Sequence, residues 1–420
     1  MSRIRFTLQA MAHGGDALGR HQGKVIFVPY GIPSEEVTVE IVEDKKRYAR
    51  GRLVEIHTTS SHRTDPPCPY FGDCGGCHWQ HVEYSAQLEY KQSIVTNVLT
   101  RIGKISKPPV KPTIGMEEPW LYRNNMRFGT DSLRRLGLRA RASHRIIPVE
   151  SCMILHPMLQ ELYDLLDLGD PTLRQLTFRC GARTGDAMLI FEMDNDQPPE
   201  LETDTTISCV LSLADGRSAV LIGSSHIYER LGELRLRISS GSFFQVNTSQ
   251  AEKLVGVVRR YLEPTGDEVL LDAYCGVGTF GLALAGQVSQ VIGIEESPSA
   301  IEDARFNAGG LEHVSFYEGR VEDMLPGIEA HVDLAILDPP RAGCQPAVLK
   351  ALMERTPRRI AYVSCDPATL ARDLRVLANG GYELQEVQPV DMFPQTAHIE
   401  VVALLTRVLS WLKVEGCSST

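Results

Sequence analysis

The second half of the chain alternates between short apolar runs and amphipathic segments. Apolar runs at 269–271, 291–294, 332–337 and 360–364 have the length and composition of buried strands. Between them, residues 251–262 and 298–307 show helical periodicity. The second of these helices starts at Ser297 and Pro298, since serine caps free amides and proline suits the first helical position. Strands that alternate with helices predict an α/β domain with a doubly wound sheet over residues 243–420.

The first sixty residues follow a different pattern. Apolar and polar residues alternate in short runs, such as Ile4, Phe6 and Leu8, which is the period of a half-buried strand. Several such runs, separated by turn-forming residues, predict a small β-barrel of the oligonucleotide-binding kind over residues 1–60. This segment holds nine Lys and Arg against seven Asp and Glu, so its charge alone does not distinguish an RNA-binding barrel from a structural one.

Residues 61–242 predict a central domain of mixed α and β structure. Its strands are short and are expected to be mainly antiparallel. Two segments have helical character, residues 80–101 and residues 157–168. In the first of them, Leu88, Val95 and Leu99 share one apolar face.

Composition favours an ordinary globular protein. A chain of 420 residues with 43% hydrophobic content predicts two or three domains with normal cores. No apolar run has the length of a membrane span, and the first residues lack the apolar core of a signal peptide. We therefore expect a cytoplasmic protein whose cysteines are mostly reduced, and a monomer with no obligate protein partner.

The net charge of −10 argues against a surface that binds nucleic acid without specificity. Residues 120–147 are the exception, because they contain a single acidic residue and seven arginines: Arg123, Arg127, Arg134, Arg135, Arg139, Arg141 and Arg145. With Trp120, Tyr122 and Phe128 as aromatic neighbours, this stripe predicts an RNA-binding groove. A solvated arginine-rich hairpin is the alternative.

Three cysteines lie close together at Cys68, Cys74 and Cys77, with two glycines between the last two. In a reducing compartment such spacing indicates a metal site rather than disulfides. Thiolates suit either zinc or an iron–sulfur cluster, and the spacing leaves both open. Either metal needs a fourth ligand from elsewhere in the chain.

The first apolar run of the α/β domain leads into a glycine loop, Gly276-x-Gly278-x-x-Gly281. Such loops let the backbone approach a nucleotide-like cofactor closely. Glu295 follows roughly 20 residues later, where an acidic residue binds ribose hydroxyls. Because this fingerprint is shared, a nicotinamide-linked oxidoreductase remains an alternative.

Four segments, in this order, carry a more specific signal: 272–280 (DAYCGVGTF), 337–343 (LDPPRAG), 364–373 (SCDPATLARD) and 391–400 (DMFPQTAHIE). Over nearly its whole length the chain resembles the RNA uracil-C5 methyltransferases, a class I family that uses S-adenosylmethionine. The resemblance implies that residues 1–60 form a TRAM domain. It also implies a set of cofactor-binding residues: Gln245, Tyr274, Glu295 and Asp338.

The same resemblance implies a [4Fe-4S] cluster whose fourth ligand is Cys152, joining Cys68, Cys74 and Cys77. Cys180 or Cys209 would replace Cys152 only if the match at 149–153 were wrong. In this family the cluster would have a structural or RNA-positioning role.

Methylation of uracil at C5 needs a thiolate, because C5 becomes electron-rich only after a nucleophile has added at C6. Cys365 suits this role. It follows a strand and precedes Asp366 and Pro367, which read as the start of a helix, and a helix amino terminus lowers the pKa of a nearby thiol. Cys275 is the rival nucleophile, but it falls inside the cofactor loop.

Glu400 suits the base that removes the C5 proton, because it leads an otherwise apolar strand, and His398 is its helper or substitute. The resemblance implies that this last strand is antiparallel and lies beside the strand that ends at Cys365. The predicted function is methyl transfer from S-adenosylmethionine to C5 of an RNA uridine. The barrel favours 23S ribosomal RNA, with the T loop of transfer RNA as the alternative. A non-catalytic iron–sulfur RNA-binding protein would require the nucleophile or the glycines to be lost, and both are present.

Overall fold

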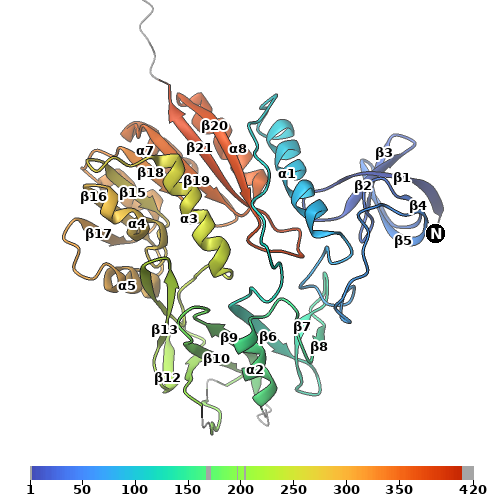
Figure 1. Ribbon diagram of the computed structural model, residues 1–420, viewed down its shortest axis with the longest axis horizontal. Coiled ribbons are helices and arrows are strands. Elements are labelled where there is room, and N and C mark those ends of the chain that lie inside the picture. Colours follow the sequence, from blue (N-terminus) through green and yellow to red (C-terminus); the bar gives the residue numbers. More distant parts are fainter. Residues whose placement is uncertain (1, 167–171, 196, 203–204, 409–420) are drawn as a thin grey trace, which may run out of the picture.

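The computed structural model describes residues 2–166, 172–195, 197–202 and 205–408. Three groups of elements are visible in Figure 1: a barrel near the N-terminus, a lower layer of strands in the middle of the chain, and an α/β layer formed by the second half. The predicted domain limits at 60 and 242 stay predictions. Residues 167–168 of the expected second helix and 409–420 of the expected last domain lie outside the described residues.

The N-terminal residues form a closed five-stranded barrel, as their alternation predicted. Its strands are β1 (Arg3–Met11), β2 (Ala17–His21), β3 (Lys24–Val28), β4 (Glu36–Asp44) and β5 (Tyr48–Thr58), in the order β1-β2-β3-β5-β4. Phe6 and Leu8 are buried while their neighbours Arg5 and Thr7 are exposed, so the period-two pattern fills the barrel.

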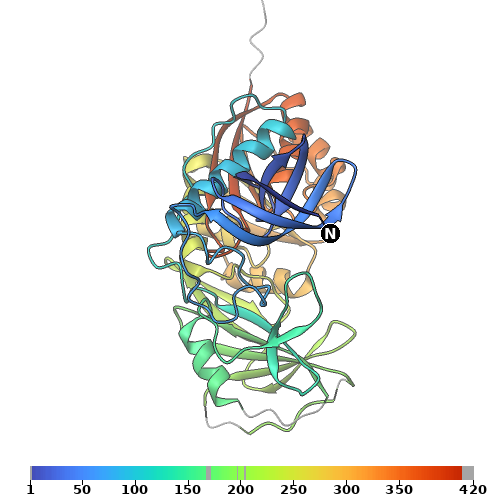
Figure 2. The ribbon, with the colours of Figure 1, turned by 90° about the vertical axis from the view of Figure 1, so that its right-hand side faces the viewer.

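A long connection leads from the barrel to α1 (Tyr84–Arg101), which starts four residues later than the predicted position 80. The difference arises because residues 79–82 form a turn, closed by a hydrogen bond from Val82 N to Trp79 O of 2.9 Å. Helix α1 contacts β1 of the barrel on one side and α8 (Pro367–Asn379) on the other. The first helix therefore joins the barrel to the second half of the chain (Figure 2).

The middle of the chain forms a seven-stranded sheet in the order β12-β11-β10-β9-β6-β7-β8. All its pairs are antiparallel except β10 with β11, which confirms the mainly antiparallel prediction. The elements are β6 (Asn125–Thr130), β7 (Leu136–Arg139), β8 (Ile146–Pro148), α2 (Pro157–Leu165), β9 (Leu173–Cys180), β10 (Ala187–Met193), β11 (Ser208–Ser212) and β12 (Ser218–Ile222), followed by the hairpin β13 (His226–Leu231) and β14 (Leu234–Ser239).

For Tyr122 and Phe128 the aromatic part of the predicted RNA groove is wrong, whereas Trp120 is only half-buried. Tyr122 and Phe128 are buried, and Phe128 packs against Tyr163 and Phe178 with ring centroids 5.0 and 5.2 Å apart. Successive side chains of a strand point to opposite faces, so on β6 exposed Arg127 and buried Phe128 are separated. These aromatic rings belong to the core of the central sheet.

The second half of the chain forms a doubly wound sheet in the order β17-β16-β15-β18-β19-β21-β20, which confirms the predicted fold class. The strands are β15 (Val269–Ala273), β16 (Gln290–Glu295), β17 (Val314–Glu318), β18 (Leu334–Leu337), β19 (Arg359–Ser364), β20 (Tyr382–Val390) and β21 (Glu400–Arg407). The helices, besides α8, are α3 (Thr248–Leu262), α4 (Thr279–Leu284), α5 (Pro298–Asn307), α6 (Val321–Met324) and α7 (Pro346–Arg355), with short 3₁₀ turns at Ala285–Gln287 and Leu325–Gly327.

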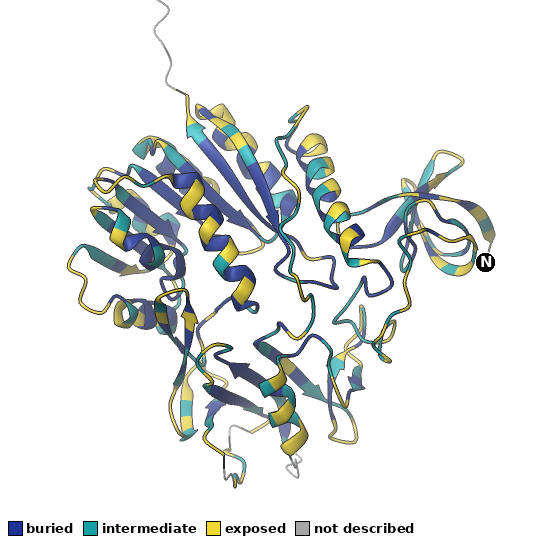
Figure 3. Cartoon of the chain, in the orientation of Figure 1, coloured by how far each residue is buried: buried dark blue, intermediate teal, exposed yellow. Residues whose placement is uncertain are grey.

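Burial follows the layers of this sheet. In Figure 3 the central strands are buried along their length, and the helices that cover them are exposed only on their outer faces. The first five strands of the sheet are parallel, and β21 is antiparallel to both β19 and β20. No helix among the described residues is long and apolar enough to cross a membrane.

Candidate active site

The loops that follow β15, β16, β18 and β19 line one cavity of about 540 Å³, together with the loop before α3 and the start of β21. Carboxyl ends of parallel strands meet at one edge of a sheet, which is where such folds bind ligands. All six residues predicted for cofactor binding and catalysis line this cavity: Gln245, Tyr274, Glu295, Asp338, Cys365 and Glu400.

The glycine loop is held directly by Glu295. Its carboxylate accepts hydrogen bonds from Gly276 N at 3.0 Å and from Ser297 N at 2.8 Å, so it bridges the loop and the start of α5. Gly276 and Gly278 have φ of +55° and +88°, a backbone conformation that favours glycine. The carboxylate is thereby fixed in orientation on the cavity wall, and its remaining lone pairs are free to accept from a ligand.

Asp272 supports the same loop from below. It is fully buried at the end of β15, and its carboxylate accepts a hydrogen bond from Gly281 N at 2.7 Å. Burial raises the pKa of Asp272 to about 7. The sequence analysis assigned Asp272 no role. Its position between the predicted strand and the glycine loop could have indicated that it supports the loop.

Cys365 and Glu400 come together because β21 inserts beside β19 in the antiparallel direction. Ser364 pairs with Val401, so the residue after β19 and the first residue of β21 lie at the same edge. Glu400 is buried, whereas Cys365 is partly exposed to the cavity. The arrangement of these two strands is the one that the family resemblance implied.

The expected low pKa of Cys365 is wrong. Burial raises the pKa of this thiol to about 11, and the neighbouring Glu400 carboxyl adds to the effect. Asp366 and Pro367 do start α8, but the Asp366 carboxylate accepts from Ala368 N at 2.7 Å and Thr369 N at 3.2 Å. The free amides that would stabilise a thiolate are therefore already partly satisfied.

Arg341 is a residue of the site that sequence reasoning missed, although it lies within the quoted 337–343 segment. It is exposed, follows β18 and lines the cavity. Its positive charge lowers the pKa of Cys365 and that of Glu400, against the larger effect of burial on both. Arg341 is therefore the nearby cation that favours a thiolate.

The pH dependence of thiol alkylation tests this electrostatic arrangement. With a pKa of about 11, Cys365 is protonated at pH 7, and its thiolate fraction grows with pH. Its alkylation by iodoacetamide should therefore rise about tenfold per pH unit from pH 7 to 9, followed by mass spectrometry of the Cys365 peptide. Arg341→Ala should slow the reaction. A rate that is already independent of pH at pH 7 would contradict the raised pKa.

The two candidate bases, Glu400 and His398, have pKa values that are shifted in opposite directions. Burial, followed by the nearby Asp338 carboxylate, raises the pKa of Glu400 well above its usual range, so its ionised form is a strong base for a carboxylate. His398 packs its ring against Phe393 and His78, each with centroids 5.7 Å away. Burial of the ring and nearby positive charge lower the pKa of His398, which makes it the weaker base.

Cys275 also contributes to the cavity wall but is only 3% exposed. Its sulfur lies 3.0 Å from the position that a Cβ on Gly293 would occupy, which places it against β16. Burial raises the pKa of Cys275 well above its usual range. Of the two cysteines considered, Cys365 is the one that is partly exposed to the cavity.

A second cavity of about 530 Å³ contains the predicted metal ligands. Cys68, Cys74, Cys77 and Cys152 all line it, the first three from the connection before α1 and the last from the segment before α2. Cys180 and Cys209 lie instead in the buried core of the central sheet. The structure therefore brings together the four cysteines that the resemblance indicated.

The chemistry of this cavity suits a group that supplies positive charge. Burial raises the pKa of Cys77 to about 12, and the charges of the other three cysteines add to it, so thiolates here need a cation. Among the described residues, however, no three histidine, cysteine or acidic side chains are placed so that they could hold a metal ion. The iron–sulfur cluster therefore stays a prediction, which rests on the four cysteines that line one cavity.

Comparison with known proteins identifies the family. An uncharacterised RNA methyltransferase of Halalkalibacterium halodurans is 39% identical to this chain, and the match covers 96% of both proteins. The chain belongs to the RNA methyltransferase family. An uncharacterised RNA methyltransferase of Listeria innocua, 38% identical, matches 96% of the chain and 98% of its own length.

Two family models and one solved structure agree with the fold of this RNA methyltransferase. Residues 2–54 match the TRAM domain and residues 264–396 match a methyltransferase domain. The solved structure is the Pyrococcus abyssi tRNA (uracil-54, C5)-methyltransferase in complex with S-adenosyl-L-homocysteine. It is 27% identical, covers 96% of this chain and 100% of its own, and gives a TM-score of 0.76. The TRAM prediction for the N-terminal barrel is confirmed.

The arginine stripe of this RNA methyltransferase is only partly free. Arg127 pairs with Glu192 at 2.9 Å, Arg135 with Asp131 at 2.8 Å, and Arg141 with Asp16 of the barrel at 2.5 Å. In the described part of the chain, three exposed arginines of the stripe make no ion pair: Arg134, Arg139 and Arg145. They lie on and beside β7 and β8, and Arg139 also lines the four-cysteine cavity.

Proposed function

We propose that this protein methylates C5 of a uridine in RNA, with S-adenosylmethionine as the methyl donor and Cys365 as a covalent nucleophile. One observation carries the proposal: Cys365 and Glu400 lie at adjacent strand ends, in the same cavity as the four proposed cofactor residues. A nicotinamide-linked oxidoreductase would leave this pair without a role, and a non-catalytic RNA-binding protein would not need it.

The cofactor residues fit an adenosyl ligand. Glu295 presents a carboxylate, fixed by Gly276 N and Ser297 N, that can accept from ribose hydroxyls. Tyr274 is half-buried in the wall beside the glycine loop, and Gln245 and Asp338 lie across the same cavity. The bound cofactor would supply an electrophilic methyl group, and the complex of the Pyrococcus relative with S-adenosyl-L-homocysteine supports this assignment.

Cys365 then acts on the uracil ring. Its sulfur adds to C6, which moves electron density through the ring to C5 and makes that carbon nucleophilic. Because the thiol starts protonated, it loses its proton to solvent before the S–C6 bond forms, and the positive charge of Arg341 favours the resulting thiolate. Covalent addition splits one difficult substitution into easier steps.

Glu400 completes the reaction after C5 has received the methyl group. It takes the C5 proton, the electron pair of that C–H bond re-forms the C5–C6 double bond, and the sulfur of Cys365 leaves C6. Burial, and after it the Asp338 carboxylate, raise the pKa of Glu400, so its ionised form is a stronger proton acceptor than an ordinary carboxylate. The released thiolate of Cys365 then regains a proton from solvent.

We also propose that Cys68, Cys74, Cys77 and Cys152 hold a [4Fe-4S] cluster. Protein purified without oxygen should be brown and contain about four irons and four sulfides per chain. Cys152→Ser should remove most of the colour, whereas Cys180→Ser, at a buried cysteine outside the cavity, should keep it. Metal and sulfide analysis provides the measurement; stoichiometric zinc without iron would contradict the cluster.

Two RNA targets need to be compared. The barrel led us to favour 23S ribosomal RNA. However, the match to the Pyrococcus transfer-RNA enzyme covers 96% of this chain, so most of the barrel must have a counterpart in that enzyme. The barrel therefore does not separate the two targets. The preference for 23S ribosomal RNA that the sequence suggested thus loses its basis, and we propose ribosomal RNA and the T loop of transfer RNA as two equal candidates.

Measuring 5-methyluridine at both positions in a deletion strain tests the function and its target together. The modification should disappear at one position, return with the wild-type gene and not return with Cys365→Ala. Unchanged 5-methyluridine in every RNA of the deletion strain would contradict uridine-C5 methylation as the function.

A further inference from the structure

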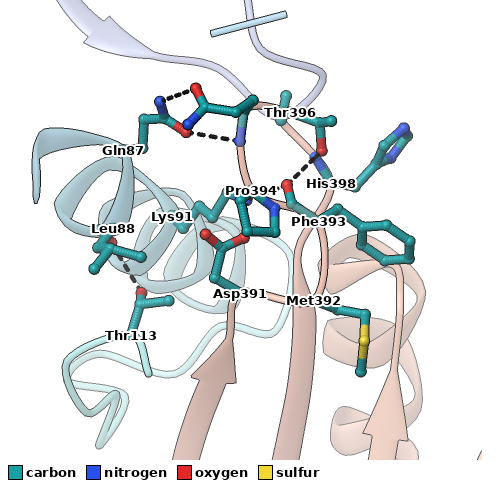
Figure 4. Close-up of polar contacts among 12 residues, drawn as sticks. Gln87, Leu88, Lys91, Thr113, Asp391, Met392, Phe393, Pro394, Thr396 and His398 are labelled. Carbon is teal, nitrogen blue, oxygen red and sulfur yellow. Dashed lines mark hydrogen bonds and ion pairs between the residues drawn. The ribbon is translucent and has the colours of Figure 1, made fainter. Parts of the chain in front are cut away.

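The loop of residues 391–399 joins β20 to β21 and ends immediately before Glu400. Phe393 and His398 of this loop line the catalytic cavity. Figure 4 shows that both side chains point away from α1, while Asp391 points toward Lys91 on that helix. The loop therefore has one side in the cavity and the other against the N-terminal half of the chain.

Gln395 is the strained point of this loop. It has φ of +66°, in the left-handed region that side chains other than glycine adopt at a cost, and it is only 3% exposed. Backbone of this kind persists where surrounding contacts determine it, and such positions cluster at active sites. The conformation of the loop must therefore be imposed by its neighbours.

Those neighbours are residues 78–87. His78 N and Trp79 N both donate to the Gln395 carbonyl, each at 3.0 Å. The buried side-chain amide of Gln87 forms two hydrogen bonds with Gln395. Its Oε1 accepts from Gln395 N at 3.1 Å, and its Nε2 donates to Gln395 Oε1 at 2.9 Å. The same Nε2 donates to Trp79 O and Val82 O, so Gln87 fixes the turn and the loop together.

A buried ion pair anchors the first residue of the loop. Lys91 and Asp391 are both fully buried, and Lys91 Nζ also donates to Phe393 O at 3.1 Å. Tyr84 donates to the second carboxylate oxygen of Asp391 at 2.8 Å. Removing one member would leave the other charged and buried, which is strongly unfavourable, so this end of the loop is firmly held.

The N-terminal end of the 78–91 segment lies at the four-cysteine cavity, opposite the end that carries Lys91. His78 directly follows Cys77, and Gln80 lines the cavity, where its Oε1 accepts from Cys68 N at 3.3 Å. Within residues 77–80, Cys77 and Gln80 line the four-cysteine cavity, whereas His78 and Trp79 hydrogen-bond to the strained Gln395.

We infer that residues 78–91 are a positioning device through which the filled cysteine cavity holds the 391–399 loop, and with it Glu400, in its reactive place. The inference rests on the proposed function and extends it by giving the cluster a role. Gln87 is the central positioning residue, because its amide touches both the turn after Cys77 and Gln395.

Gln87→Leu tests the positioning role. This variant should lower kcat by about 10²-fold with little change in KM for RNA, since a misplaced catalytic group costs about that much. It should also accumulate the methylated covalent adduct expected of Glu400→Gln. Gln92→Leu, on the same helix with an amide that instead donates to Val110 O, is the matched control and should keep both kcat and iron content.

Hydrogen exchange tests the link to the cysteine cavity without relying on activity. In Cys152→Ser, amides of residues 393–399 should exchange about tenfold faster than in the wild type, as expected when a buried hydrogen bond is lost. Amides of the glycine loop, 276–281, lie in the same catalytic cavity but outside this device and should not change. In Gln87→Leu the 393–399 amides should exchange fast whether or not iron is present.

The outcomes separate the proposals. Wild-type protein that contains iron but shows equal exchange at 393–399 with and without it would overturn the coupling alone. Wild-type protein without iron would overturn the cluster and the coupling together. If Glu400→Gln accumulates adduct and a folded Gln87→Leu turns over normally, the proposed chemistry stands and the positioning role of Gln87 is wrong.

Discussion

Cys365→Ala is expected to lower the methylation rate by roughly 10⁴- to 10⁶-fold while RNA binding persists, because enzymes that lose a covalent nucleophile lose chemistry of that order. The side chain is partly exposed in the cavity wall, so its truncation removes the sulfur without opening the core. The measurement is transfer of a labelled methyl group to RNA, with RNA affinity determined separately.

A mechanism-based trap identifies the reacting thiol directly. RNA carrying 5-fluorouridine should form a stable covalent complex with the wild-type enzyme, because fluorine cannot leave C5 as a proton does. Cys275→Ala is the matched control, since that cysteine lies in the same cavity wall but is buried against β16. It should still be trapped, and Cys365→Ala should not. A complex that survives in Cys365→Ala and is lost in Cys275→Ala would reverse the assignment.

Glu400→Gln is expected to slow turnover by about 10²- to 10⁴-fold, which is the usual contribution of a general base. The effect should fall on the last step, since addition of Cys365 and arrival of the methyl group both precede loss of the C5 proton. The variant should therefore accumulate protein joined to RNA that already carries the methyl group. A denaturing gel of the variant with unmodified RNA and radioactive S-adenosylmethionine would show a labelled, shifted band.

The shape of the site makes glutamine a clean replacement. Glu400 is buried, and no described residue forms an ion pair with it, so an amide of equal size removes the proton acceptor without breaking a salt bridge. Normal turnover of the variant would mean that His398, Asp338 or water, and not Glu400, is the base. Absence of both turnover and adduct would mean that Glu400 mainly maintains the geometry of the cavity.

Local pattern was sufficient for the elements and for much of the chemistry. Helix α5 spans Pro298–Asn307 as predicted, with Ser297 Oγ accepting from Ala300 N at 3.4 Å, because capping and proline placement act between near neighbours in sequence. The barrel and the doubly wound sheet follow from periods of two and 3.6 residues, which decide which face of each element is buried. The four motifs were specific enough to indicate the family and the residues of the cavity.

What the pattern could not determine depends on atoms far apart in the chain. The pKa of Cys365 is raised first because the thiol is buried and then because Glu400 and Asp338 lie near it, whereas the sequence showed only the helix start that follows it. Arg341 received no role for the same reason, since its charge acts on residues of two other strands. Tyr122 and Phe128 looked like RNA contacts until the sheet placed them in its core.

The contacts between residues 78–91 and the 391–399 loop are the clearest case. Gln87 and Gln395 are 308 positions apart, and neither type of residue signals a buried pair when read alone. Only the packing of α1 against the α/β layer creates the space in which their amides meet and in which Lys91 and Asp391 can be buried as a pair. Hydrogen bonds and ion pairs of this kind are short-ranged in space and unconstrained in sequence, so the folded chain alone decides them.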